Sequence, residues 1–213
     1  MKANTVGNLQ DILDTDLVWR RKEISTLISI AKTSEFAAQT YLVRACVPLL
    51  YAHWEGFSKQ CFTRYLEFVS YRRLKYKSLN PSFLFIASSP SLNKIKTSGV
   101  RDGLSIVRDF LDKTEDVNKE NFRKRVDTKS NLRSEVICDL LALCGLPFNE
   151  FSDEHTFIDK ELCDPRNEVA HGVGGGPSLN ALIERRDKAF GIMTRLQTIV
   201  VNAAIGSQYR VAA

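Results

Sequence analysis

Features of metal-binding, disulfide-bonded and membrane proteins are scarce in this sequence. Its five cysteines form no Cys-x-x-Cys pair, and none of its three histidines stands at ligand spacing from a cysteine. We therefore expect no metal site and no other cofactor. The cysteine count is odd and the surroundings, such as RACVPLL and LLALCGL, are apolar. This pattern predicts reduced, mostly buried thiols.

Segments that direct a chain to a membrane are also missing. A membrane span needs about 18 consecutive apolar residues, and no such run occurs. The start, MKANTVGNLQDILDTDLV, has no basic region followed by an apolar one, so we expect no signal peptide. These absences predict a cytoplasmic protein that does not engage a membrane.

Signals for β-strands are almost absent, because no alternating apolar runs are bounded by Asn-Gly or Asp-Gly turns. Helical periodicity instead runs nearly throughout. It predicts helices over 11–32, 35–76, 100–113 and 131–146, from about 153, and over 178–204. The second helix is apolar almost all round in its first half, which is typical of the centre of a bundle, and Pro48 is expected to kink it. Residues 80–99 are expected to be mainly loop, and 114–130 to be mobile and charged.

Positive charge is concentrated in the middle of the chain. The net charge is +5, and residues 61–133 carry 16 Lys or Arg against 8 Asp or Glu. Such an excess is typical of a nucleic-acid binder, although a solvated surface is an equally good interpretation. The residues expected to contact nucleic-acid phosphates are Arg72, Arg73, Arg123, Lys124 and Arg125.

The stretch DPRNEVAHGVGGGP (164–177) combines helix-forming residues with a glycine-rich end. At about 100° per helical residue, Asn167 and His171 point away from the core-facing Val169 and lie one turn apart. Arg166 lies at the flank, where its long side chain can join them. Histidine transfers protons near neutral pH, and arginine stabilises phosphate charge.

Other interpretations of this stretch remain open. His171 and Asn167 can serve merely to end a helix, since Gly172 suits the position after the C-cap and histidine suits the helix dipole. Pro165 can also begin a new helix with Asp164 as N-cap, whose free amides would face an anion.

Two polar residues lie on the otherwise apolar second helix. Glu55 either pairs with an arginine such as Arg44 or Arg166, or supports the site by orienting Arg166 or His171. His53 is expected to be a core histidine.

Two segments together resemble one family. The pattern Arg166-Asn167-x-x-Ala170-His171-Gly172 resembles the R-x(4–6)-H motif of the HEPN superfamily (higher eukaryotes and prokaryotes nucleotide-binding). YAHWEGFSKQCFTRYLEFV (51–69) resembles the Y-x-H-W-E-G-F segment of a bacterial HEPN-like nuclease subfamily. The resemblance spans about 36–70 and 130–205, whereas 71–129 resemble no family.

The resemblance implies an all-α, antiparallel helical bundle. It further implies a single domain, 1–213, with a long kinked central helix and a less regular subfamily-specific insertion at 71–129. Many members are metal-independent endoribonucleases, so the expected reaction is attack by the RNA 2′-hydroxyl, which leaves 2′,3′-cyclic phosphate. His171 would transfer the proton, Arg166 would stabilise charge, and Asn167 would hold the imidazole or the phosphate.

The resemblance also implies partners. Members commonly form homodimers with two facing motifs, and they recur in toxin–antitoxin and antiviral defence systems. We therefore expect RNA, a second copy and an antitoxin or defence protein as partners. Two other functions remain open. One is a non-catalytic HEPN module that binds nucleotide, RNA or a protein. The other is an interaction subunit of a defence complex that docks through 71–129.

Overall fold

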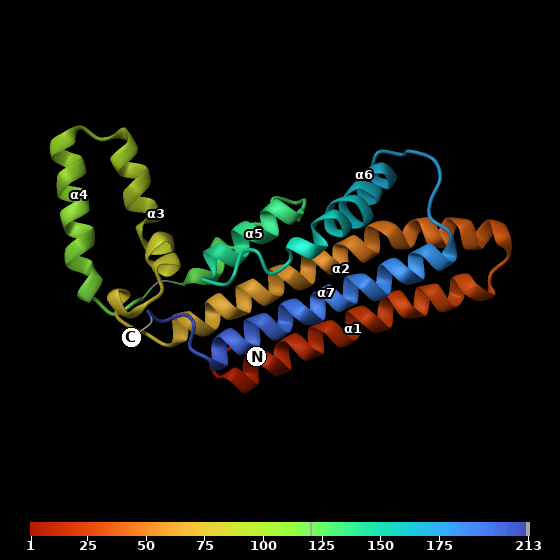
Figure 1. The fold of residues 1–213 in the computed structure, drawn as a ribbon, viewed down its shortest axis with the longest axis horizontal. Coiled ribbons are helices and arrows are strands. Elements are labelled where there is room, and N and C mark those ends of the chain that lie inside the picture. Colours follow the sequence, from red (N-terminus) through yellow and green to blue (C-terminus); the bar gives the residue numbers. More distant parts are fainter. Residues whose placement is uncertain (120, 212–213) are drawn as a thin grey trace.

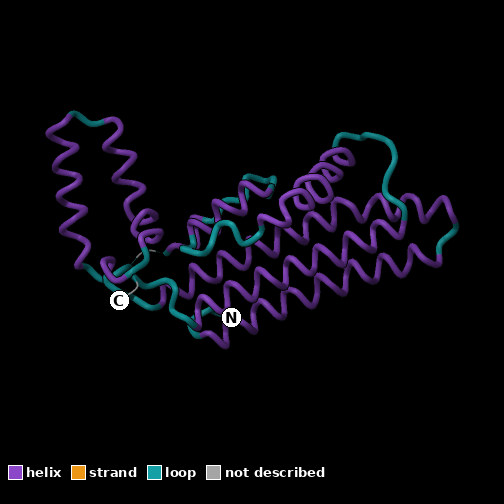
Figure 2. Tube along the Cα trace, viewed as in Figure 1, coloured by secondary structure: helices purple, strands orange, loops and turns teal. Residues whose placement is uncertain are grey.

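The computed structural model describes residues 1–119 and 121–211, and it is built from helices (Figures 1 and 2). No strand occurs in these ranges, which confirms the expected all-α fold. No helix among the described residues is long and apolar enough to cross a bilayer. The α-helices are α1 (Val6–Thr33), α2 (Phe36–Tyr71), α3 (Pro81–Thr97), α4 (Val100–Asp112), α5 (Ser134–Leu143), α6 (Asp164–Ala170) and α7 (Leu179–Ile205).

The three longest helices form the bundle that carries the rest of the chain (Figure 1). α1 and α2 run antiparallel, whereas α7 runs in the direction of α2 (Figure 1). Each presents a periodic apolar face, and α2 is buried along most of its length. Burial of these faces is the main driving force for the fold. Pro48 lies inside α2, which is one helix from end to end.

Gly56 allows α1 and α2 to approach each other closely. A Cβ atom at this position would lie 2.8 Å from Nη1 of Arg20 on α1. Arg20 is itself held by Asp16, whose Oδ2 lies 2.9 Å from its Nε. The glycine in YAHWEGF is therefore explained by packing against an arginine.

The prediction that residues 80–99 are mainly loop is wrong, because most of this range forms α3. Pro81 occupies the first turn, where its missing N–H costs nothing, and the Asn80 side chain caps the helix by accepting from the Ser82 amide at 3.1 Å. Phe83 and Ile86 are buried and anchor α3 to the core. The prolines suggested a break, but the first of them instead begins a helix.

The prediction that residues 114–130 are mobile is also partly wrong. Phe122, Asn118 and Thr128 are buried, and the ring of Phe122 packs against Phe83 with 5.5 Å between centroids. The Phe122 amide also donates to the Ser70 hydroxyl at 3.2 Å, which ties this segment to α2. The later part of α3 and α4 project away from the bundle (Figure 1).

The helix before α6 is a π-helix, Phe157–Cys163, that continues into α6 without a break. Cys163 has φ −75° and ψ −50°, so Asp164 is not an N-cap and no new helix begins at Pro165. The wider π turn accommodates a residue that lacks an N–H and crowds the preceding turn. The alternative in which a helix begins at Pro165 and the free amides of Arg166 and Asn167 face an anion is therefore wrong.

Candidate active site around α6

Arg166 is held by two contacts that fix its guanidinium. Its Nη2 donates to the carbonyl oxygen of Ser130 at 2.8 Å, and its Cζ lies 4.1 Å from the centroid of the Tyr51 ring. The side chain is half-buried, and its Nε has no hydrogen-bond partner among the described residues. A cation stacked on an aromatic face has little rotational freedom, so the guanidinium is fixed in one orientation.

Tyr51 and Glu55 lie one turn apart on α2 and face the same loop. The Tyr51 hydroxyl accepts from the Leu132 amide at 2.7 Å. Burial raises the pKa of Tyr51 to about 12, although the Leu132 amide and Arg166 oppose this. The Glu55 Oε1 atom accepts from the Thr128 hydroxyl at 2.6 Å. No ion pair joins Glu55 to an arginine within the described ranges, so the expected pairing with Arg44 or Arg166 is wrong.

Residues 128–134, here called the strap, pass between α2 and the helix that ends in α6. The strap forms hydrogen bonds with α2 at Thr128 and Leu132, and with the helix that ends in α6 at Ser130, Arg133 and Ser134. Trp54 Nε1 donates to the Leu132 carbonyl oxygen at 3.1 Å, and Arg133 donates to Asp164 at 2.6 Å. Lys129 and Ser130 have φ of 56° and 54°, a conformation that costs about 1–2 kcal/mol per non-glycine residue. The surrounding contacts must maintain this conformation.

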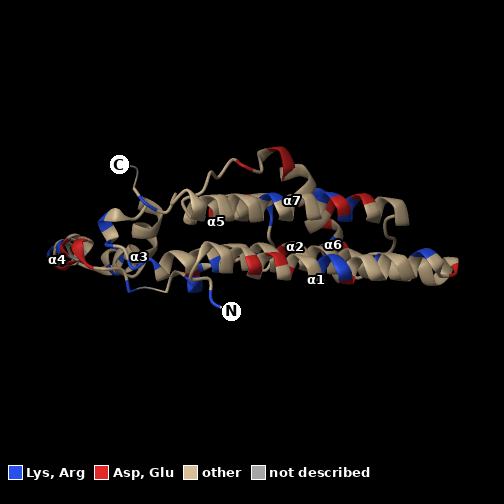
Figure 3. Cartoon of the chain, turned by 90° about the horizontal axis from the view of Figure 1, so that it is seen from below, with Lys and Arg blue, Asp and Glu red and all other residues tan. Residues whose placement is uncertain are grey.

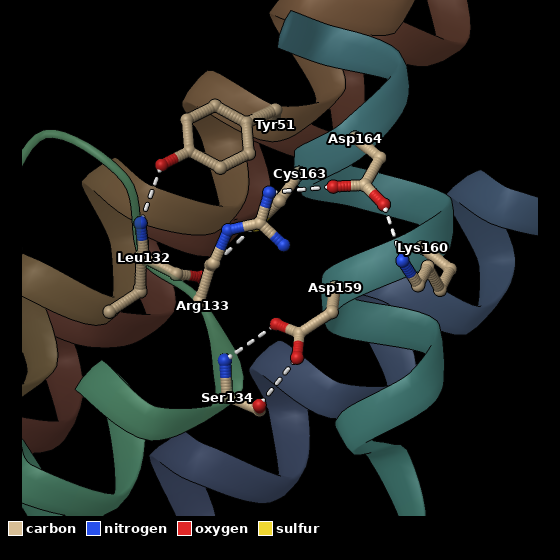
Figure 4. A network of polar contacts seen from close by, with 8 residues as sticks. All are labelled: Tyr51, Leu132, Arg133, Ser134, Asp159, Lys160, Cys163 and Asp164. Atoms are coloured by element: carbon tan, nitrogen blue, oxygen red, sulfur yellow. Dashed lines mark hydrogen bonds and ion pairs between the residues drawn. The ribbon is translucent and has the colours of Figure 1, made fainter.

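A carboxylate network anchors the far end of the strap (Figure 4). Asp159 accepts from the Ser134 amide at 2.8 Å and from its hydroxyl at 2.6 Å, so it caps α5 from another helix. Arg133 and then Lys160 hold the pKa of Asp164 below its ordinary value. The network fixes the strap, and with it the Ser130 carbonyl that binds Arg166.

Asn167 follows Arg166 on α6, and His171 is the C-cap of this helix. The His171 amide donates to the Asn167 carbonyl oxygen at 2.9 Å, and Gly172 follows with φ 75°. The Val173 amide donates back to Glu168 at 2.9 Å, which completes a Schellman helix end. The His171 side chain is exposed, and its ring has no hydrogen-bond partner in the described part of the chain. The residue thus ends the helix and presents its imidazole to solvent.

A small cavity of about 250 Å³ lies beside this helix end. Arg44 from α2, Arg185 from α7, Glu168 and the glycines of 174–176 contribute to its lining. Arg44 also donates to the Gly175 carbonyl oxygen, which tethers the glycine loop to α2. The cavity brings two arginines close to α6, but Arg185 is paired with Glu161 at 2.6 Å and Arg44 binds the glycine loop.

The five predicted RNA-binding residues do not share one environment. Arg72 is half-buried, donates to the Asn4 carbonyl oxygen and stacks 4.4 Å from the Phe68 centroid. Arg123 lies 3.4 Å from the buried Glu67. Arg73, Lys124 and Arg125 are exposed and have no ion pair with any residue of the described ranges. Three of the five residues are therefore available to bind a phosphate.

Two of these residues share a polar cavity. Arg73 and Arg123 line a space of about 450 Å³ at the end of α2. Ser70 in this cavity is fifteen residues beyond Glu55 on α2, which corresponds to about 22 Å at 1.5 Å per residue. Basic residues here are remote from α6 and could bind only a distal part of an extended ligand.

Sequence reasoning did not single out Tyr51, Thr128 or Ser130 as members of the site. Tyr51 had a signal, because it precedes Glu55 by four residues and so shares its helix face. Thr128 and Ser130 had none, since their contacts join segments distant in sequence. His53 is the buried histidine that was expected: it is 2% exposed, and its Nε2 lies 3.2 Å from Glu23 Oε2.

Comparison with known proteins identifies one family. The family model described as RiboL-PSP-HEPN matches residues 15–202. No curated protein and no solved structure matches the chain. The matched range includes both α2 and α6, and it also includes the middle segment that resembled no family.

Proposed function

Because the chain belongs to the RiboL-PSP-HEPN family, within the HEPN superfamily, we propose that it is a metal-independent endoribonuclease. The family as a whole indicates a nuclease or other RNA-related function. The observation that carries the proposal is that Arg166 and His171 have different environments. Arg166 is immobilised by Tyr51 and Ser130, whereas His171 is exposed at the helix end.

The chemistry follows from these positions. The 2′-hydroxyl of an RNA nucleotide attacks the adjacent phosphorus, and the His171 imidazole removes its proton. The bond from phosphorus to the 5′-oxygen breaks, and that oxygen takes up a proton. The products are a 2′,3′-cyclic phosphate and a 5′-hydroxyl. Arg166 stabilises the charge on the phosphoryl oxygens, and Asn167 holds the imidazole or the phosphate.

The need for both an acid and a base in this reaction favours a homodimer of the chain. One chain offers a single exposed histidine on α6, whereas the reaction benefits from both a base and an acid. A two-fold symmetric pair supplies both groups when the two His171 side chains face one cleft. Exposure of His171 and of the adjacent glycine loop supports this arrangement.

We expect a His171→Cys variant to form an intermolecular disulfide in mild oxidant. Val18→Cys is the matched control, because Val18 is exposed on α1 and is remote in sequence from the motif. The measurement is the dimer band on non-reducing gels, together with the solution mass by light scattering. A monomeric parent chain with full activity would contradict the paired site.

A second function is favoured by two observations. Arg166 already donates one of its N–H groups to the Ser130 carbonyl oxygen, and its Nε is buried, so fewer of its donors are available to a phosphate. The His171 ring also lacks an orienting partner among the described residues. Both fit a non-catalytic HEPN module that binds nucleotide, RNA or a protein.

Incubation of the purified chain with total RNA in excess chelator separates the two. Cleavage with cyclic phosphate ends supports the nuclease, and RNA binding without cleavage supports the non-catalytic module.

With either function, we propose that the chain acts in a toxin–antitoxin or antiviral defence system. A partner protein there would neutralise it by covering α6.

RNA binding is expected to depend on the exposed basic residues. We predict that reversing Arg73, Lys124 and Arg125 to glutamate flattens the dependence of log affinity on log salt by about two units, since each phosphate contact on a single strand contributes about 0.7. The half-saturating RNA concentration should rise, and the cleavage rate at saturation should change much less. The measurement is fluorescence anisotropy across a salt series.

The matched control reverses Lys2, Lys22 and Lys32, which are exposed near or on α1. Both triple variants have the same net charge. If the control flattens the salt slope as much as the test variant, the middle of the chain is only a solvated surface.

A further inference from the structure

A cavity of about 680 Å³ lies between α3 and α5, outside the residues assigned to the chemistry above. Small-ligand sites are typically about 300–1,000 Å³ and mostly apolar, with a few polar groups. Phe85 is 59% exposed in this wall, although Phe83 and Ile86 on the same helix are buried. The apolar lining consists of Pro81, Phe85, Val136, Leu140, Ala142 and Leu143.

The two walls of this cavity are fixed to each other. The Ser82 hydroxyl donates to the Ala142 carbonyl oxygen at 2.8 Å and so joins α3 to the end of α5. The Ser82 amide is in turn capped by the Asn80 side chain. Phe85 lies less than one turn further along α3. The exposed ring is therefore presented on a preformed wall, which lowers the entropic cost of binding.

The rim carries four charged residues in two different situations. Lys129 Nζ lies 2.9 Å from Asp127 Oδ2, and this contact holds the pKa of Asp127 below its ordinary value. These two charges offset each other. Arg125 and Asp139 are exposed and form no ion pair with any residue of the described ranges. The cavity thus offers one uncommitted cation and one uncommitted carboxylate beside an exposed aromatic ring.

We propose that this cavity binds one nucleotide of a single-stranded RNA. The base stacks on Phe85, Arg125 binds a phosphate, and the Asp139 carboxylate accepts from a base amino group or a ribose hydroxyl. Single-stranded RNA is bound in this way, by aromatic stacking combined with cationic contacts and hydrogen bonds to base edges. The assignment of RNA rests on the proposed function, whereas the set of ligand-binding groups does not.

The position of the cavity links it to α6. Lys129 lines the cavity, and the next residue, Ser130, provides the carbonyl oxygen that holds Arg166. Successive Cα atoms are about 3.8 Å apart. A nucleotide in the cavity therefore lies next to the segment that positions Arg166. The cavity would hold one nucleotide of a strand that continues toward α6.

The test uses the His171→Ala chain, so that RNA is bound without being cut. Replacing Phe85 with alanine in this background is expected to weaken binding of a single-stranded oligoribonucleotide about ten-fold, the effect of losing one base stack. Phe85→Trp should retain binding, and its fluorescence should be quenched when a base stacks on it. Arg125→Ala should weaken binding and reduce the salt slope by about 0.7.

Matched controls are available on the same chain. Phe148 is 63% exposed and lies outside this cavity, so Phe148→Ala should leave binding unchanged. Arg101→Ala, at an exposed position on α4, is the control for Arg125→Ala. Undiminished binding by Phe85→Ala, or equal losses with Phe148→Ala, would overturn the proposal.

Two further arms separate the sources of the ligand and the two proposals. Adenosine and uridine 5′-monophosphate are titrated alone. If either binds as tightly as the oligonucleotide and quenches Phe85→Trp, the site is one for free nucleotide, and the RNA proposal fails. If the parent chain cuts RNA but binding ignores Phe85, the cavity proposal fails and the ribonuclease stands. If binding depends on Phe85 but the parent cuts nothing, the cavity proposal stands alone.

Discussion

Replacing His171 with alanine is expected to abolish RNA cleavage and to leave the melting temperature unchanged. The imidazole is exposed, and its ring has no hydrogen-bond partner among the described residues, so its loss removes no stabilising contact. A positioned acid or base typically contributes about 10²- to 10⁴-fold to the rate. The measurements are cleavage of a labelled RNA in EDTA and thermal unfolding followed by circular dichroism.

His155→Ala is the histidine control, because the only hydrogen bond of the His155 ring among the described residues is with Cys138 Sγ at 3.5 Å. It should cleave normally. Undiminished cleavage by His171→Ala, or a strict requirement for magnesium, would rule out the proposed mechanism.

Arg166→Ala should also lose cleavage, but its effect on stability should differ. In the structure the guanidinium binds the Ser130 carbonyl oxygen and stacks on Tyr51. Loss of a hydrogen bond from a charged donor costs about 1.5–3 kcal/mol. A destabilised Arg166→Ala beside an undisturbed His171→Ala is therefore the expected pattern.

Tyr51→Phe is expected to destabilise the fold by about 1–3 kcal/mol, because it leaves the buried amide of Leu132 without its acceptor. The phenyl ring still stacks on Arg166, so cleavage at saturating RNA should fall only modestly. Urea denaturation measures the stability, and initial rates at saturating RNA measure the activity.

Tyr65→Phe is the matched control for this experiment. Its hydroxyl is buried and has no hydrogen-bond partner within the described ranges, so its removal should be neutral or stabilising. Equal destabilisation of the two variants would show that the strap gains nothing from the Tyr51 hydroxyl.

The fold class and the family could be predicted from the sequence, because both depend on local patterns. Apolar residues at helical spacing placed α1, α2, α4, α5 and α7 near their observed positions, since burial of one face is what stabilises such helices. The motif Arg166-Asn167-x-x-Ala170-His171-Gly172 together with YAHWEGF indicated the HEPN superfamily, which the family match confirms. The helix stop at Gly172, the residue after the C-cap of α6, was an equally local signal.

Local rules failed where tertiary contacts compete with them. Pro81 begins α3 because Asn80 supplies the cap and Phe83 and Ile86 are buried. Pro165 lies inside a continuous helix because a π turn precedes it. In both cases a residue that usually ends a helix is tolerated, since packing and capping offset its cost.

The sequence by itself determined an all-α bundle, its family, and the placement of Arg166, Asn167 and His171 on one helix end. Only the tertiary structure decided what surrounds them. It placed the strap between α2 and α6, gave Glu55 a threonine partner in place of an arginine, and stacked Arg166 on Tyr51. The physical reason is range: helical periodicity is set by neighbours a few residues apart, whereas these contacts join residues separated by 36 to 115 positions. Such contacts form only when burial of the apolar faces brings the helices together.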